Sequence, residues 1–178
     1  MLEGIRVIEL EGIGPGPFAG MTLADLGADV VKVHRPSPTQ EDKKETLSLL
    51  DRGKRSVILN LKDQKDKHTL KGLIKGADVL IEGHRPGVME RLGFDEKTVF
   101  KLNPNIIFGR ITGWGQGGPN ATQAAHDLNY ISKTGSLWFS SNEGGIPFTP
   151  PTMVGDIGGG ALYLVIGILA ALFRVKNG

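Results

Sequence analysis

Residues 5–17, IRVIELEGIGPGP, decide the fold of this 178-residue chain. The first six residues alternate like a β-strand, and the rest are rich in turn-forming glycine and proline. A helix is predicted over residues 18–26, ended by Gly27, and a second strand over residues 29–34. A strand, a glycine-rich turn, a helix and another strand in this order are typical of a parallel sheet.

The pattern continues along the chain. Further strands are predicted at residues 56–59, 78–82 and 106–112, with helices at 64–75, 88–92 and 96–102 and a polar, irregular segment at 37–50. Alternating strands and helices of this length indicate an α/β fold with a mostly parallel sheet and flanking helices, built as a single domain over residues 1–178.

Composition narrows the function classes. The net charge is only +2, so no nucleic-acid surface is indicated, and the absence of cysteine excludes thiol catalysis and thiolate metal sites. The histidines show no metal-ligand spacing, so no metal is expected. The uncharged run at residues 157–173 is shorter than the roughly 20 residues that span a bilayer. It is opened by glycines, and a buried core helix is expected there rather than a membrane segment.

Basic residues follow the predicted strands where a parallel sheet binds its ligands. The loop after the first strand is not a dinucleotide fingerprint, because Pro17 replaces the third glycine and the second strand ends in Arg35 rather than an acid. An arginine there suits a ribose-linked phosphate, as in NADP or coenzyme A. A multiply phosphorylated nucleotide is therefore predicted, with further cations at Arg52, Lys54, Arg55, Lys62, Arg85 and Arg91. The alternative is that these are solvated surface charges.

The chemistry-bearing residues come later in the chain. His126 and Asp156 each lie beside glycine-rich backbone, and an imidazole with a carboxylate can remove a proton from carbon and return it. A neutral imidazole is the base, and a protonated carboxyl is the donor on the opposite face of the carbon. Two alternatives remain open: His126 is a structural residue, or Asp156 caps the apolar helix that follows it.

Several separate motifs, in the right order, resemble one family. Residues 9–18, 26–33, 52–56 and 78–82 (ELEGIGPGPF, LGADVVKV, RGKRS and DVLIE) resemble the α-methylacyl-CoA racemases, within the class III CoA-transferases of the CaiB/BaiF type. The resemblance covers essentially the whole chain. It implies a Rossmann-like large domain, with a smaller second domain that this chain lacks.

The resemblance also implies roles for individual residues. His126 and Asp156 match the catalytic histidine and aspartate of the racemases. An acyl-CoA thioester is then the substrate, and no cofactor is needed because coenzyme A is part of that substrate. The positions that match coenzyme A contacts are Arg35, Leu59, Asn60, Leu61, Lys62, Gly83, His84, Arg85, Arg91, Ala125, Asp127, Leu128, Asn129 and Tyr130.

The family contains two chemistries. The racemases exchange the α-proton of 2-methylacyl-CoA thioesters through an enolate, whose oxygen we expect a backbone N–H near Asp127 to hold. The transferases use the residue equivalent to Asp156 as a nucleophile. The HDLNY motif at residues 126–130 resembles the racemase branch, which acts in fatty acid and bile acid metabolism. A transferase, or a catalytically silent coenzyme A-binding and dimerising module, are the alternatives.

The resemblance further implies an interlocked homodimer and a soluble protein without membrane or nucleic-acid partners. It would reside in the mitochondrion or peroxisome in a eukaryote, and in the cytoplasm in a bacterium.

Overall fold

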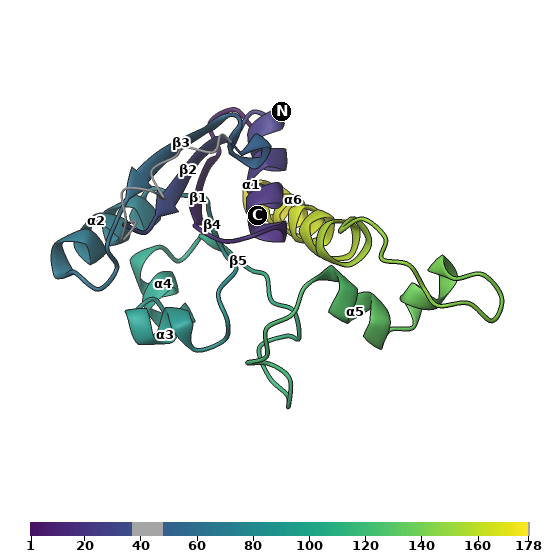
Figure 1. The fold of residues 1–178 in the computed structure, drawn as a ribbon. Coiled ribbons are helices and arrows are strands. Elements are labelled where there is room, and N and C mark those ends of the chain that lie inside the picture. The colour runs from purple at the N-terminus through teal and green to yellow at the C-terminus, as the bar shows by residue number, and fades with distance from the viewer. Residues whose placement is uncertain (37–47, 178) are drawn as a thin grey trace.

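A five-stranded parallel sheet forms the centre of the molecule (Figure 1). The computed structural model describes residues 1–36 and 48–177, so most of the polar segment predicted at 37–50 lies outside the described residues. The strands are β1 (Arg6–Leu10), β2 (Asp29–His34), β3 (Lys54–Ile58), β4 (Val79–Glu82) and β5 (Ile107–Arg110). They lie in the order β3-β2-β1-β4-β5, and every neighbouring pair is parallel. The predicted α/β class is confirmed.

Helices cover both faces of this sheet. The α-helices are α1 (Pro15–Asp25), α2 (Gln64–Lys75), α3 (Val88–Leu92), α4 (Glu96–Leu102), α5 (Asp127–Lys133) and α6 (Leu162–Asn177). Two 3-10 helices, η2 (Leu49–Asp51) and η3 (Ser136–Ser140), and a π-helical segment, η4 (Val154–Ala161), complete the described elements. α1 and α6 lie on one side of the sheet, and α2, α3 and α4 on the other (Figure 1).

A separate hydrophobic core lies on each face of the sheet. On one face Val7, Val30 and Ile81 pack with Leu23 of α1 and Ile168 of α6. On the other face the alternate strand residues Ile8, Val31 and Leu80 pack with residues from the helical layer. Those residues are Leu70 and Ile74 of α2, Met89 of α3 and Phe94 between α3 and α4. Burial on both faces explains why β1, β2 and β4 each have apolar residues at consecutive positions, namely Val7–Ile8, Val30–Val31 and Val79–Leu80–Ile81.

Helix α1 begins three residues earlier than the predicted residue 18. Two prolines, at positions 15 and 17, argued against a helix there, yet the first-turn N–H groups of a helix have no intrahelical partner. Proline therefore costs no hydrogen bond at these positions, and its fixed φ suits the helix. Gly14 precedes the helix with a φ of 70°, a conformation that favours glycine.

The apolar C-terminal run is helical, as predicted, but it starts with wider turns. In η4 the N–H of Gly158 donates to the carbonyl of Met153 at 2.8 Å, a π-helical spacing. Asp156 lies inside this segment and not at its N-cap, which is Met153, so the capping alternative for Asp156 is wrong.

The η4–α6 helix has one buried and one exposed face. Ala161, Val165, Ile168 and Leu172 pack into the core, whereas Tyr163 and Ile166 are exposed. Residues Val154–Lys176 are long and apolar enough, by length and composition, to cross a membrane. Core helices of soluble proteins meet the same criterion, but only 33% of this window is buried, so packing on the sheet explains the apolar residues of the buried face and not exposed ones such as Tyr163 and Ile166.

Candidate functional site

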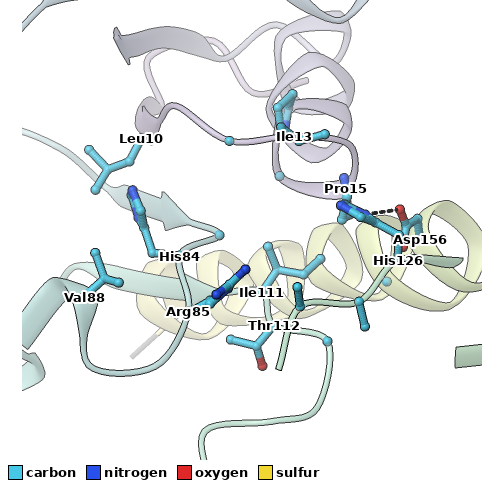
Figure 2. A pocket seen from close by; sticks show the side chains of 18 of the residues that line it. Leu10, Ile13, Pro15, His84, Arg85, Val88, Ile111, Thr112, His126 and Asp156 are labelled. Atoms are coloured by element: carbon cyan, nitrogen blue, oxygen red, sulfur yellow. Dashed lines mark hydrogen bonds and ion pairs between the residues drawn. The ribbon is translucent and has the colours of Figure 1, made fainter. Parts of the chain in front are cut away.

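A cavity of about 990 Å³ opens at the carboxyl ends of the strands. It is lined by the loops after β1 and β4, which are neighbours in the sheet although the connections leaving them run in opposite directions along it. This reversal is the topological switch point, where open α/β sheets bind their ligands. Figure 2 shows His84 and Val88 toward one end of the cavity and His126 with Asp156 toward the other.

Most of the predicted site residues line this cavity. They come from five separate segments: Arg35, Leu59, Asn60, Leu61, Lys62, Gly83, His84, Arg85, Ala125, His126, Tyr130 and Asp156. Four predicted residues are not among its lining residues, namely Arg91, Asp127, Leu128 and Asn129. Leu92, next to Arg91, does line it. The coenzyme A contacts assigned by resemblance stay predictions for all of these residues.

His126 and Asp156 are in direct contact. The Nδ1 atom of His126 lies 3.1 Å from Oδ2 of Asp156 (Figure 2). The imidazole is 61% exposed and the carboxylate only 6%. The two groups were predicted on opposite faces of a substrate carbon, and a 3.1 Å contact leaves no space for a carbon between these two atoms. The exposed imidazole is the partner that can rotate to open this contact.

The HDLNY motif at residues 126–130 is held together by internal hydrogen bonds. His126, the N-cap of α5, donates its backbone N–H to Oδ1 of Asn129 at 3.0 Å. The Tyr130 hydroxyl donates to the carbonyl of Ala125 at 2.6 Å, and its ring packs edge-on against Trp114 with centroids 5.1 Å apart. Burial, with a smaller contribution from the negative charge of Asp156, raises the pKa of Tyr130. These side chains fix the position of the histidine.

Glycine brings the first loop close to this pair. A Cβ atom on Gly14 would lie 3.4 Å from Oδ2 of Asp156, and a Cβ atom on Gly113 would lie 2.3 Å from the Tyr130 hydroxyl. A side chain at position 113 would therefore collide with Tyr130, whereas Gly14 is set by its φ of 70° and leaves room only for close contact with Asp156. The glycine-rich sequences therefore permit the strand-end loops to pack directly on the His126–Asp156 pair.

Of the seven predicted cations, three line the cavity and four do not: Arg91, already noted, and Arg52, Lys54 and Arg55. Arg35, Lys62 and Arg85 are lining residues, and the Arg35 side chain is 87% exposed. By contrast Arg52, Lys54 and Arg55 do not line the cavity, and they pair with Asp25, Glu9 and Asp29 respectively. The expectation that those three help to bind a phosphorylated ligand has no support. They follow one another closely in the sequence, but β3 begins at the opposite edge of the sheet from the cavity.

The buried carboxylate of Glu82 contacts both the backbone and the imidazole of His84. Glu82 is fully buried, accepts the backbone N–H of His84 at 2.8 Å, and pairs with Arg110 at 2.8 Å. Its carboxylate also lies 3.3 Å from His84 Nδ1. Burial opposes ionisation of Glu82, but the hydrogen bonds from His84 and Arg110 outweigh it and lower the pKa of this carboxyl. The orientation of His84 thus depends on an ionised group in the sheet.

Sequence reasoning missed Glu11 as a cavity residue. Its Oε2 accepts the backbone N–H of Arg35 at 2.8 Å, and its Oε1 lies 4.0 Å from His34 Nδ1. Glu11 therefore ties the end of β1 to the end of β2 and partly balances the positive charge there. The position of Glu11 directly after the first strand was the available signal, since that is where a parallel sheet binds ligands.

The fold and the site together show to which class of protein the chain belongs. This is a parallel α/β domain with a histidine–aspartate pair and a cationic rim on one cavity at its switch point. The chain belongs to the CoA-transferase family III, whose model matches residues 2–178.

Its relatives include both a racemase and CoA-transferases. Alpha-methylacyl-CoA racemase from Mus musculus is 42% identical over 100% of this chain and 45% of the racemase. Acetyl-CoA:oxalate CoA-transferase from Acetobacter aceti is 37% identical over 99% of this chain and 48% of the transferase. A crystal structure of Rv3272 from M. tuberculosis superposes with a TM-score of 0.86 at 32% identity, covering 98% of this chain and 49% of that one. The chain thus spans about half the length of the relatives it matches.

Proposed function

We propose that this chain provides the thioester site of a racemase that interconverts the (R) and (S) forms of 2-methylacyl-CoA by exchanging the α-proton. The observation that carries the proposal is the contact of His126 with Asp156 at the edge of a cavity whose rim holds Arg35, Lys62 and Arg85. An acid–base pair and phosphate-binding cations on one cavity fit a thioester of coenzyme A. The identity to the mouse racemase supports the same assignment.

The proton transfers follow from the contact. In the closed pair Nδ1 of His126 donates to Asp156, so Nε2 of the neutral imidazole is unprotonated, and it can accept the α-proton once the pair has opened. The C–H electron pair then becomes part of an enolate, whose oxygen is stabilised by backbone N–H groups in the first turn of α5, near Asp127. Asp156, which must carry a proton at the start of this step, gives that proton to the opposite face of the enolate carbon, which inverts the carbon and leaves an imidazolium on His126 and a carboxylate on Asp156.

The pair must open to admit the substrate. Rotation of the exposed imidazole separates His126 from Asp156, and the α-carbon enters between them. Asp156 stays fixed, because it is nearly fully buried and its neighbours hold its backbone. In the reverse reaction the two groups exchange roles.

Uptake of deuterium tests the proposal. The chain is incubated with a 2-methylacyl-CoA in D₂O, and the mass of the recovered thioester is measured by mass spectrometry. We expect uptake of one deuterium, lost in His126→Ala and kept in the control His68→Ala, which changes an exposed histidine of α2. Absence of uptake by folded wild-type chain would contradict activity of this chain by itself.

A transferase is the second candidate, because relatives such as the Acetobacter aceti enzyme carry that name. In this reaction the Asp156 carboxylate attacks the thioester carbonyl, the C–S bond breaks, the coenzyme A thiolate leaves, and a mixed anhydride forms on the aspartate. Incubation with acyl-CoA and hydroxylamine would convert that anhydride to a hydroxamate on Asp156, which peptide mass spectrometry detects. A trapped hydroxamate without deuterium uptake would favour the transferase.

A silent binding module is the third candidate. Titration calorimetry with coenzyme A separates it from the others, since this module would bind coenzyme A and catalyse neither reaction. We also propose that the protein forms a homodimer, as the resemblance to the racemases implies. Light scattering of the purified chain tests that assignment.

A further inference from the structure

The Asp127 carboxylate is buried next to the catalytic pair without lining the cavity. Asp127 is the first residue of α5 and is 5% exposed. Its Oδ2 atom accepts two backbone hydrogen bonds, from the N–H of Gly155 at 2.7 Å and from the N–H of Asp156 at 2.9 Å. A buried charge is stable when hydrogen bonds replace its hydration, and these two bonds do so.

These bonds connect the two halves of the pair. His126 directly precedes Asp127 in the chain, and Asp156 donates one of the two N–H groups. The backbone is also in tight contact here, because a Cβ atom on Gly155 would lie 3.2 Å from the Asp127 carbonyl oxygen. The start of α5 and the Asp156 turn are therefore held at a fixed separation.

The other polar side chains of the HDLNY motif, those of Asn129 and Tyr130, make hydrogen bonds within residues 125–130 and do not reach the turn that carries Asp156. Asn129 bonds to the backbone of His126, and Tyr130 bonds to the carbonyl of Ala125, so both fix α5 and its own entry loop. Within the described ranges 1–36 and 48–177, the side-chain hydrogen bonds that join this segment to the Asp156 turn are those of Asp127 and the His126–Asp156 contact itself.

We infer that Asp127 is a positioning residue, which holds the Asp156 turn beside the start of α5 and so sets Asp156 against Nδ1 of His126 in the closed pair, where this contact favours the tautomer with the proton on Nδ1. The inference deepens the proposed racemase function and rests on it for its catalytic meaning. Its structural part concerns the ring of His126 alone and does not need turnover. The orientation of a ligating or catalytic imidazole is set by what its other nitrogen contacts.

The tautomer of His126 tests the structural part. ¹⁵N NMR of the imidazole ring, recorded at alkaline pH where imidazoles are neutral, distinguishes a proton on Nδ1 from one on Nε2. The His126→Ala spectrum identifies the His126 signals among the four histidines of the chain. We expect the Nδ1–H form to dominate in the wild type and to lose its majority in both Asp156→Asn and Asp127→Ala.

Two further variants separate positioning from charge and from stability. Asp127→Asn removes the charge but keeps an oxygen that can accept both N–H groups, so it should retain the wild-type tautomer. Asp63→Ala is the matched control, because Asp63 Oδ1 also accepts two backbone N–H groups, at 2.8 and 3.2 Å, at the start of α2 far along the chain from the site. It should leave the tautomer unchanged.

A double variant completes the test. Asp127→Ala added to Asp156→Asn should change the tautomer no further, since Asp127 acts through Asp156. A wild-type ring with its proton on Nε2, or an Asp127→Ala ring identical to wild type, would overturn the inference. So would an equal loss of the Nδ1–H form in Asp127→Asn and Asp127→Ala, because charge alone would then explain it.

Deuterium uptake tests the catalytic part. In Asp127→Ala we expect the exchange rate at saturating thioester to fall about 100-fold, the size expected for misplacement by about 1 Å, with the affinity for coenzyme A unchanged. Equal losses of affinity and rate would contradict a positioning role. If the wild type shows no uptake while the tautomers behave as expected, the proposed racemase activity of this chain fails and the positioning by Asp127 stands.

Discussion

The sheet region, residues 5–110, and the C-terminal region, residues 113–177, are built differently. In the sheet region the strands are covered on both faces by helices, and large side chains such as Phe94 and Ile8 are fully buried. In the C-terminal region Phe139 is 91% and Ile146 93% exposed, and both catalytic candidates lie there. The site is carried by the part of the chain that has the least core of its own.

The site in the C-terminal region is held in place by contacts with the sheet region. η4 packs on α1 and α5, and α6 packs on β5. Gly14, at the start of α1, lies against Asp156, and Asp127 bonds to the turn that carries it. The C-terminal region is thus positioned by the packing of η4 and α6 in the core on one face of the sheet and by a few specific hydrogen bonds, whereas the core on the other face belongs to the sheet region alone.

The largest effect should come from the centre of the sheet region. A Cβ atom on Gly20 would lie 1.9 Å from Oε2 of Glu9, which is paired with Lys54 at 2.6 Å in full burial. Gly20→Ala forces this pair apart and should lower the free energy of unfolding by about 3–5 kcal/mol, the cost of breaking a buried ion pair. Urea unfolding measures it.

Gly72→Ala is the matched control for that helix substitution. Gly72 is an exposed residue of α2 with open space around its Cβ position, so alanine should stabilise the chain by about 0.5–1 kcal/mol. Opposite signs for the two variants would locate the effect in the Glu9–Lys54 pair. Equal stability of Gly20→Ala and wild type would show that the pair tolerates displacement.

The junction between the two regions is tested on α6. Ile168 is 2% exposed and packs in the core with the sheet, whereas Ile166 on the same helix is 59% exposed. Ile168→Ala should cost about 2–4 kcal/mol, and Ile166→Ala less than about 0.5 kcal/mol. Thermal unfolding compares the two. Equal costs would contradict the packing of this helix on the sheet by one face.

Acid sensitivity is expected in the sheet region at Glu82. Its pKa in the folded chain is lowered, so the unfolded chain binds more protons, and the contribution of Glu82 is fully present above the ordinary carboxyl pKa and lost as pH falls through the folded value. Glu82→Gln should therefore destabilise by about 1.5–3 kcal/mol near neutral pH and by less near about pH 3. Glu96→Gln, at an exposed partner of the same Arg110, should change little at either pH.

The smallest change in stability is expected on the exposed face of the C-terminal region. Tyr163 and Ile166 form part of an apolar surface on α6, and apolar surfaces of this kind promote association. We expect the chain to self-associate, and Ile166→Lys to weaken association while changing the free energy of unfolding by less than about 0.5 kcal/mol. Light scattering measures it, and a monomeric wild type would contradict the expectation.

The α/β class and nearly all the elements of the sheet region could be predicted from the sequence. Strand β2 matches its predicted range, and the ends of the other strands shift by at most two residues, because period-two apolar patterns and glycine or proline boundaries are local signals. Most of the predicted site residues also line one cavity, since carboxyl ends of parallel strands meet at one edge of a sheet.

Three features needed the tertiary structure. Lys54 looked like a ligand-binding cation, but its Nζ lies 2.6 Å from Glu9 Oε2 with both side chains buried, although their strands β3 and β1 are separated by β2. Asp127 was predicted as a coenzyme A contact, which stays a prediction, but no local pattern showed that its side chain accepts hydrogen bonds from residues 28 and 29 positions further along the chain. His126 and Asp156 were predicted as a pair, yet their direct contact was not.

The sequence by itself thus determined the fold class, the family and the residues around the cavity, because these depend on local periodicity and on short motifs. The tertiary structure decided which charges are free to meet a ligand and how the histidine and aspartate face each other. Those properties depend on distances between segments far apart in the chain, and no local pattern encodes such distances.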